Sequence, residues 1–176
     1  GSKDERPGRT GFAHLFEHLM FKGSRNVSRE QHMSRVASLG GQANAYTTED
    51  VTVFWETVPS HALPLVLWLE ADRMASLRID RETLENERAV VKEERRMRID
   101  NQPYGRLSEL IYENAFTVHP YKHVTIGSMA DLEAANADDV RDFYETYYVP
   151  ENATVALVGD FDSAQAMELV TKYLGR

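Results

Sequence analysis

Residues 11–22, GFAHLFEHLMFK, place two histidines and a glutamate among strongly apolar residues. At 3.6 residues per turn, His14 and His18 stack one turn apart on one helical face, and Glu17 lies on the adjoining edge. The surrounding apolar residues favour a helix that packs into a core. The stretch therefore predicts a buried helix that presents two metal ligands and a base. A histidine on an apolar face is also often an ordinary core residue. If this helix does bind a metal, a third ligand has to come from elsewhere in the chain.

A second helical stretch, LENERAVVKEERRM at residues 84–97, offers that ligand. Its apolar stripe falls at spacings of three, four and three: Leu84, Glu87, Val91 and Glu94. A carboxylate on a packed face is costly to ionise unless a cation accompanies it. One such cation is a metal ion, since catalytic zinc takes three protein ligands and keeps a fourth position open. The alternative is a buried ion pair with an arginine of this region, namely Arg88, Arg95 or Arg98.

Hydrophobic periodicity predicts mostly helices and one hairpin. Helices are expected at 11–22, from Ser28 to Gly40-Gly41, at 60–77, from Asp80 to the break before Pro103, at 104–116, at 137–147 and from Ser163. Ser28 and Gln31 have capping-box spacing, and Asp80 is a good N-cap. Strands are expected at 42–48 and 51–58, joined by a turn at Glu49-Asp50, and at 153–158. This order predicts an α+β fold with a mixed or antiparallel sheet covered mainly on one side by helices.

Composition excludes several classes of function. The 176 residues are 42% hydrophobic and 27% charged, as in an ordinary globular domain. A formal net charge of −8 argues against a nucleic-acid partner, which requires basic surface. Cysteine is absent, so any metal has to be held by His, Asp and Glu. The longest apolar run, at residues 62–69, is far shorter than the roughly 20 residues of a membrane span.

The motif His14-Leu15-Phe16-Glu17-His18 resembles the H-x-x-E-H signature of the inverted-motif zinc peptidases, the insulinase, pitrilysin or M16 family. The flanking segments 8–13 and 21–24 are also similar to the family's. The family's third ligand is a glutamate about 76 residues after the second histidine, where Glu94 stands, and a further glutamate seven residues earlier matches Glu87. The resemblance covers nearly the whole chain. It is strongest to the bacterial processing-protease branch, which is similar to the mitochondrial processing peptidase β-subunit.

This resemblance implies a zinc-dependent endopeptidase that hydrolyses extended peptides or presequences. His14, His18 and Glu94 would bind Zn²⁺, which lowers the pKa of its bound water towards about 7. Glu17 would be the general base, and Glu87 would orient a ligating histidine or the water. The alternative is a non-catalytic structural or partner subunit, although such proteins usually carry a degraded motif and this one is intact.

The resemblance also implies substrate-binding residues. Asn44 and Ala45 match an Asn-Ala pair on the family's edge strand, which receives the peptide as an added strand. Phe21 matches an aromatic residue that lines the pocket for the residue after the cleaved bond. Local pattern alone permits plainer readings, in which Asn44 and Ala45 are simply part of a strand and Phe21 belongs to the core.

The remaining histidines give no second site. The segment 119–123, HPYKH, invites a metal, but Pro120 disrupts helical spacing and favours a structural loop. His32 and His61 are expected at the surface. We expect residues 1–176 to be one domain, most of the catalytic N-terminal half of a longer M16 peptidase, without its first strands and its C-terminal half. That second half would come from the same chain or from a partner in a homodimer or heterodimer. The compartment is open between periplasm, which is slightly favoured, and cytoplasm.

Overall fold

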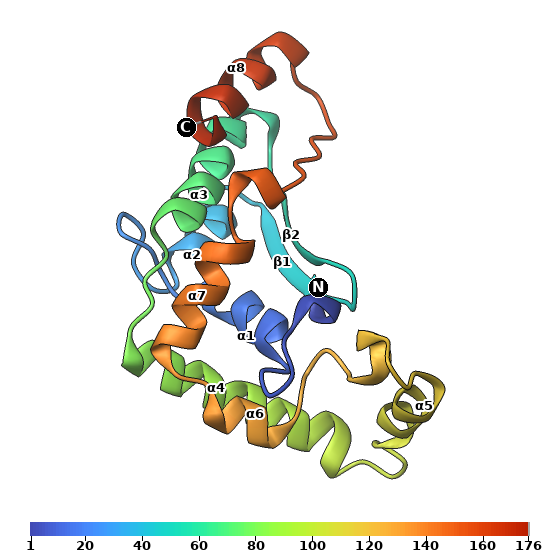
Figure 1. Ribbon diagram of the computed structural model, residues 1–176. Helices are drawn as coiled ribbons and strands as arrows, with labels where there is room; N and C mark the ends of the chain where they lie inside the picture. Colours follow the sequence, from blue (N-terminus) through green and yellow to red (C-terminus); the bar gives the residue numbers. More distant parts are fainter. Residues whose placement is uncertain (176) are drawn as a thin grey trace. The chain divides into compact units, whose positions relative to one another are not determined.

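The computed structural model describes residues 1–175, and its helices and strands are labelled in Figure 1. The longer helices are α1 (Phe12–Leu19), α2 (Gln31–Ser38), α3 (Leu63–Ser76), α4 (Arg81–Arg95), α5 (Leu107–Ala115), α6 (Met129–Ala134), α7 (Ala137–Tyr147) and α8 (Ser163–Leu174). Short 3₁₀ turns lie at Ser2–Asp4, Ser60–Ala62, Pro120–Lys122 and Pro150–Asn152, and a π-helical turn, η3, at Arg96–Asp100. In the described part of the chain, β1 (Gln42–Thr47) and β2 (Thr52–Thr57) form the sheet. The predicted α+β class is confirmed.

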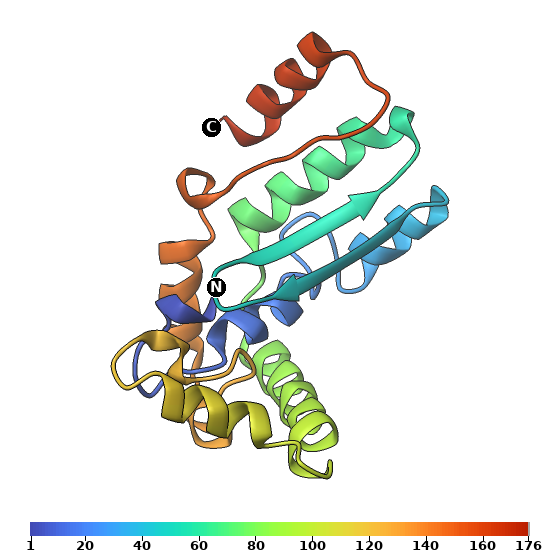
Figure 2. The same ribbon diagram turned by 90° about the vertical axis from the view of Figure 1, so that its right-hand side faces the viewer.

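The hairpin lies where alternating hydrophobicity predicted it. Strands β1 and β2 run antiparallel in Figure 2, and the Thr48 amide donates to the Val51 carbonyl at 2.8 Å to close the turn. Side-chain burial along β1 alternates, so Ala43, Ala45 and Thr47 point to one face while Asn44 points to the exposed face. The period of two in the sequence therefore reports the true register of this strand.

The structure confirms one predicted helix cap, at Asp80, and corrects another, at Ser28. The Asp80 side chain accepts the Thr83 amide at 2.8 Å and caps α4 as predicted. The capping box at Ser28 was wrong, because α2 begins three residues later at Gln31 after Glu30 adopts a left-handed conformation. The Gln31 side chain still accepts the Ser28 amide at 3.4 Å, so only the return half of the box forms.

The predicted strand at 153–158 was also wrong. These residues are extended but do not pair as a strand in the described structure, and Figure 2 draws the segment between α7 and α8 without a strand arrow. The side chains of Val155 and Val158 are 48% and 98% exposed. Their β-branched sequence supplies strand propensity, but a strand also needs a neighbour to complete its backbone hydrogen bonds. Helix α6 was not predicted.

The described chain forms two compact units, each made of separate stretches of sequence. The first unit comprises Gly1–Leu19, Ala45–Val53 and Ile79–Arg141. Its core is built on α1, which packs against α4, while α4 also packs against α6. The buried residues of α1 are Phe12, Ala13, Leu15, Phe16 and Leu19. Together with Leu84 and Val91 of α4 and Leu132 of α6, they form the apolar surroundings of the HLFEH motif.

The second unit comprises Met20–Asn44, Phe54–Arg78 and residues 142–175. Its core consists of Val27, Val36, Val66 and Leu69, and Ala43 and Val58 from the hairpin pack against this cluster. Helices α2 and α3 therefore cover the face of the hairpin base that carries Ala43, in agreement with a sheet covered on one side. None of the helices in residues 1–175 has both the length and the apolar character that crossing a bilayer requires.

A buried charged network in the second unit corrects the expectation that His32 is a surface residue. His32 is 4% exposed and its Nε2 lies 3.0 Å from Glu56 Oε1 and 3.8 Å from Glu70 Oε1. Burial lowers the pKa of His32 to about 4 and raises the pKa of Glu70 to about 7. The Arg73 guanidinium, 2% exposed, pairs with both carboxylates. Arginine thus supplies the positive charge that a metal would otherwise bring to these three groups.

Candidate metal centre

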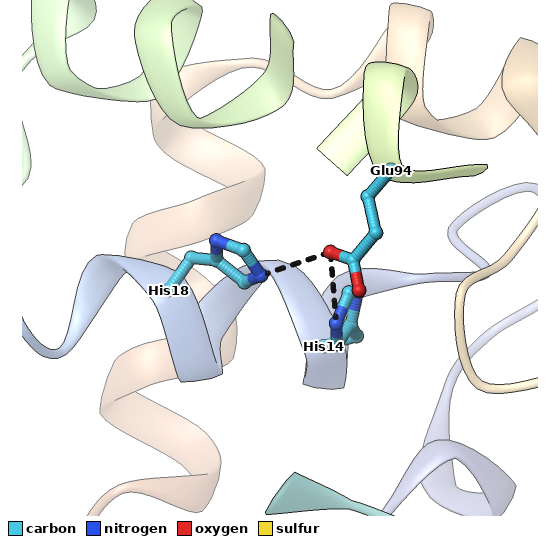
Figure 3. A group of neighbouring side chains, drawn as sticks. All are labelled: His14, His18 and Glu94. Atoms are coloured by element: carbon cyan, nitrogen blue, oxygen red, sulfur yellow. Dashed lines mark ion pairs between the residues drawn. The ribbon is translucent and has the colours of Figure 1, made fainter. Parts of the chain in front are cut away.

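The predicted metal ligands converge in the first unit. His14 and His18 project from α1 towards one carboxylate oxygen of Glu94, which extends from α4 (Figure 3). Glu94 Oε2 lies 3.7 Å from His14 Nε2 and 3.4 Å from His18 Nε2. The three candidate ligand atoms all lie within 4.8 Å of one another. The separation of 76 positions in sequence is removed by the packing of α1 on α4.

These distances fit a zinc ion. Zinc–nitrogen and zinc–oxygen bonds of about 2.0–2.2 Å at tetrahedral angles put neighbouring ligand atoms about 3.4 Å apart. Both nitrogen–oxygen distances in the triad are close to that value, so a tetrahedral ion needs little rearrangement of the side chains. One carboxylate with two imidazoles is also a donor set that zinc accepts, with a fourth position left over.

The protonation of His14 suits a metal ligand. Burial, reinforced by neighbouring His18, lowers the pKa of His14 to about 4 against the attraction of Glu94. A neutral imidazole has a lone pair available at neutral pH, which a ligand requires. The other ring nitrogen, Nδ1, is buried and makes no hydrogen bond to the described residues. Nε2, the atom nearest Glu94, is therefore the candidate donor.

The two carboxylates of α4 at this site, Glu87 and Glu94, each have further partners. Glu87, 5% exposed, places Oε2 at 3.6 Å from His18 Nδ1, on the opposite side of the ring from Glu94. This is the position from which a carboxylate can orient a ligating imidazole. Glu94 Oε1 pairs with Arg98 from the π-helical turn η3, so the arginine predicted as an alternative partner is present but uses the other oxygen. Arg88 and Arg95 bind elsewhere, to backbone carbonyls and to Glu109.

The start of helix α1 is held in place by Glu5, a residue outside the motif. Glu5 is 8% exposed, and its two carboxylate oxygens accept the Gly11 amide at 2.9 Å and the Ala13 amide at 2.7 Å. The first turn of α1 carries no acidic residue of its own, so Glu5 acts as its N-cap from outside the helix. Gly11 has a positive φ of 90°, and a Cβ there would lie 2.7 Å from the Ile126 carbonyl oxygen. Only glycine fits this entry to the helix.

Glu5 makes folding stability depend on pH. Burial raises its pKa from 4.5 to about 8, despite the two amide donors. Because the folded pKa is the higher one, the stabilising contribution is complete below pH 4.5 and is lost as pH rises through about 8. Glu5→Gln removes the ionisable group but keeps only one acceptor oxygen for the two amides, so it is expected to be less stable than wild type at pH 5 and to lose less stability by pH 9.

Thermal unfolding from pH 5 to pH 9 tests this expectation. One pKa unit corresponds to about 1.4 kcal/mol. Between pH 5 and pH 9, wild type should therefore lose several kcal/mol more of its free energy of unfolding than Glu5→Gln does. Glu85→Gln is the matched control, because that carboxylate is exposed and its pKa is lowered by Arg81. Parallel pH profiles of wild type and Glu5→Gln would contradict the assignment.

The other predicted residues occupy these positions. Glu17 lies on α1 between the two histidines, half-buried, and accepts the Thr47 hydroxyl at 2.5 Å. In the second unit, Phe21 is half-buried and its ring packs on Phe54, with centroids 5.8 Å apart, and under the Arg73 guanidinium at 5.1 Å. Asn44 and Ala45 lie in the middle of β1, with Asn44 exposed. The segment HPYKH forms a 3₁₀ turn in which the His119 ring accepts the Tyr121 amide. Sequence reasoning did not identify Thr47.

Comparisons with known proteins establish the family. The family model for insulinase, peptidase family M16, matches residues 1–129, and the model for the peptidase M16 inactive domain matches residues 134–176. The chain belongs to peptidase family M16, and the resemblance seen in the sequence is confirmed.

The similar proteins are peptidases by name. Zinc protease PqqE of Helicobacter pylori is 38% identical over 173 residues, which cover 98% of this chain and 39% of the relative. The crystal structure of a protease from Helicobacter pylori superposes with a TM-score of 0.95 at 38% identity, covering 98% of this chain and 42% of that one. A probable mitochondrial-processing peptidase subunit beta of Schizosaccharomyces pombe is 25% identical and covered to 38%. The chain thus spans about two fifths of the length of these relatives.

Proposed function

We propose that this chain is the zinc-binding catalytic part of an endopeptidase that hydrolyses extended peptides. The convergence of His14, His18 and Glu94 on one point carries the proposal. Relatives named zinc proteases support the identity of the metal. Zinc bound there supplies Lewis acidity, which makes a water molecule acidic enough to attack at neutral pH and polarises the peptide carbonyl.

The protein residues perform the remaining steps. His14 and His18 donate neutral ring nitrogens, and Glu94 contributes the one negative charge of the ligand set through Oε2. Glu87 holds the His18 ring by its Nδ1 side. Glu17 accepts a proton from the attacking water at its carboxylate and returns it to the leaving amine, as a general base and then a general acid. This metallopeptidase mechanism uses no covalent intermediate between the enzyme and the peptide.

Substrate binding is proposed for β1 and Phe21. An extended peptide can add to a sheet as a further strand, which recognises backbone more than side chains. The extended conformation of β1 at Asn44 and Ala45 is compatible with this mode. The half-buried Phe21 ring would favour an apolar residue after the cleaved bond. Presequence-like peptides, unfolded and of moderate length, are the proposed substrate class.

The length comparison supports a larger working assembly. Because the chain spans about two fifths of its relatives, we propose that it acts together with a second M16 half, in the same polypeptide or in a partner subunit. Such a half would help to enclose the substrate. Activity is therefore best measured on the natural full-length protein together with any partner that copurifies with it.

Metal removal tests the proposed function. The full-length protein is expected to cleave quenched fluorescent peptides of about 15–25 residues, to lose this activity with 1,10-phenanthroline and to regain it with one equivalent of zinc, because the metal completes the site. In the control for direct effects of the chelator on the peptide, the protein is treated with 1,10-phenanthroline and the chelator is dialysed away before the assay. Cleavage that persists after the metal content has fallen to zero would overturn the proposal. Absence of cleavage by the zinc-loaded protein would favour a non-catalytic partner subunit.

A further inference from the structure

The strand β1 contacts the proposed general base directly. Thr47, the last residue of β1, donates its hydroxyl hydrogen to Glu17 Oε2 at 2.5 Å. Both residues belong to the first unit and are half-buried. The bond joins residues 30 positions apart, so it depends on the tertiary fold and not on local sequence.

We propose that Thr47 is a positioning residue for Glu17. This inference rests on the proposed function, in which Glu17 is the general base. Thr47 does not touch the reacting atoms; it fixes one oxygen of the carboxylate so that the other oxygen, Oε1, is directed to the water proton. Thr47 and the proposed substrate residues Asn44 and Ala45 share β1, so the strand that receives the peptide also orients the base.

The chemistry of the two side chains supports this role. A glutamate side chain has considerable rotamer freedom, so an unrestrained Glu17 would spend much time away from the productive position. Threonine is stiff at χ1, because it branches at Cβ, and its hydroxyl direction is therefore set by the strand. The Thr52 hydroxyl of β2 lies 3.5 Å from the Thr47 hydroxyl, near the limit of a hydrogen bond, and adds a second polar neighbour on the hairpin.

The register of the strand makes this contact specific. Burial alternates along β1, which brings Thr47 to the same face as Ala43 and Ala45. The two alanines are apolar and small, whereas Thr47 brings the hydroxyl to the inner face at the point where Glu17 lies. A hydroxyl that served only solubility would be expected on the outer face, where Asn44 lies.

The competing explanation is purely structural, since a helix-to-strand hydrogen bond can hold α1 and β1 together without affecting catalysis. The two explanations differ in their kinetic effect. If the bond positions Glu17, its loss lowers kcat while KM, zinc content and thermal stability change little, and a variant that keeps the hydroxyl retains kcat. A merely structural bond would change stability and leave kcat in place.

Three variants of the zinc-loaded full-length protein test the proposal. Thr47→Val removes the hydroxyl and keeps shape and strand propensity, and Thr47→Ser keeps the hydroxyl. Thr57→Val, at an exposed threonine at the end of β2, is the matched control. We expect Thr47→Val to lower kcat about 10- to 100-fold, below the 10²–10⁴-fold typical of a lost general base, with KM changed less than about threefold. Thr47→Ser should stay within about threefold of wild type.

The outcomes separate this proposal from the proposed function. A lower kcat with little change in KM and an unchanged zinc content in Thr47→Val, together with near wild-type kcat in Thr47→Ser, would support positioning. Wild-type kcat in Thr47→Val, or a loss that only follows lower thermal stability, would overturn it. If wild type itself does not cleave peptides, or if Glu17→Gln cleaves as well as wild type, the proposed function fails and the positioning role fails with it.

Discussion

Glu17→Gln is expected to lower kcat for peptide cleavage by about 10²–10⁴-fold, while zinc stays at one ion per chain. General-base catalysis contributes a factor of that size, and glutamine cannot accept a proton at neutral pH. The variant keeps the shape of Glu17 and an oxygen that can still accept the Thr47 hydroxyl. Because Glu17 lies outside the triad of His14, His18 and Glu94, the loss should fall on chemistry and not on metal binding.

The measurement is kcat and KM with a quenched fluorescent peptide, alongside zinc content by mass spectrometry on the same preparation. KM should change little, since the carboxylate acts on the water and not on the peptide. Glu93→Gln is the control: Glu93 lies next to a proposed ligand on the exposed side of α4, where it pairs with Arg96. Its activity should match wild type. A Glu17→Gln protein with nearly full activity would remove Glu17 from the mechanism and leave the zinc site itself unaffected.

Sequence periodicity predicted the parts of the structure that depend on neighbours along the chain. The Asp80 cap, the hairpin register and the helix at 137–147 all depend on residues within a few positions of one another. The meeting of His14 with Glu94 is not local. A carboxylate on an apolar helix face requires a cation, which left a metal ion and an arginine as alternatives, and the resemblance to the M16 family then indicated Glu94 as a ligand. Chemistry and the resemblance together linked two helices that periodicity treated separately.

The sequence could not predict features that depend on tertiary partners. His32 reads as a polar residue in a helix, and its burial follows from Glu56 and Arg73, which approach it from other elements. The stretch at 153–158 has the composition of a strand but finds no strand partner in the described chain. Thr47 offered one weak signal, a hydroxyl on the inner face of a strand, but nothing in the sequence indicates that this face meets α1.

The two carboxylates of α4 have different environments, and this difference suggests different roles. Glu94 faces both histidines with one oxygen and Arg98 with the other, so it is held on both sides of the carboxyl group. Glu87 is more deeply buried and lies against the Nδ1 side of His18. Loss of Glu94 should therefore remove a ligand, whereas loss of Glu87 should loosen one ligand's orientation.

When the residues are replaced one at a time, the loss of zinc affinity should be larger for a ligand than for Glu87. Glu94→Gln and His18→Ala are expected to weaken zinc binding by more than about 100-fold, and Glu87→Gln by about 10- to 100-fold, the range measured for groups that orient a metal ligand. Glu94→Gln loses the negative charge of the ligand set, and His18→Ala loses a donor nitrogen one helical turn from His14.

Mass spectrometry of protein purified without added metal measures the zinc content of each variant. Competition with a zinc chelator of known affinity then measures its zinc affinity. Circular dichroism verifies that each variant is folded, and His61→Ala controls for removal of a histidine, since His61 is exposed. One zinc per wild-type chain, lost from the two ligand variants and retained more weakly in Glu87→Gln, would establish the ligand set. If wild type takes up no zinc when zinc is supplied, the convergence of the three side chains is a structural ion pair, and a non-catalytic subunit becomes the better explanation of the chain.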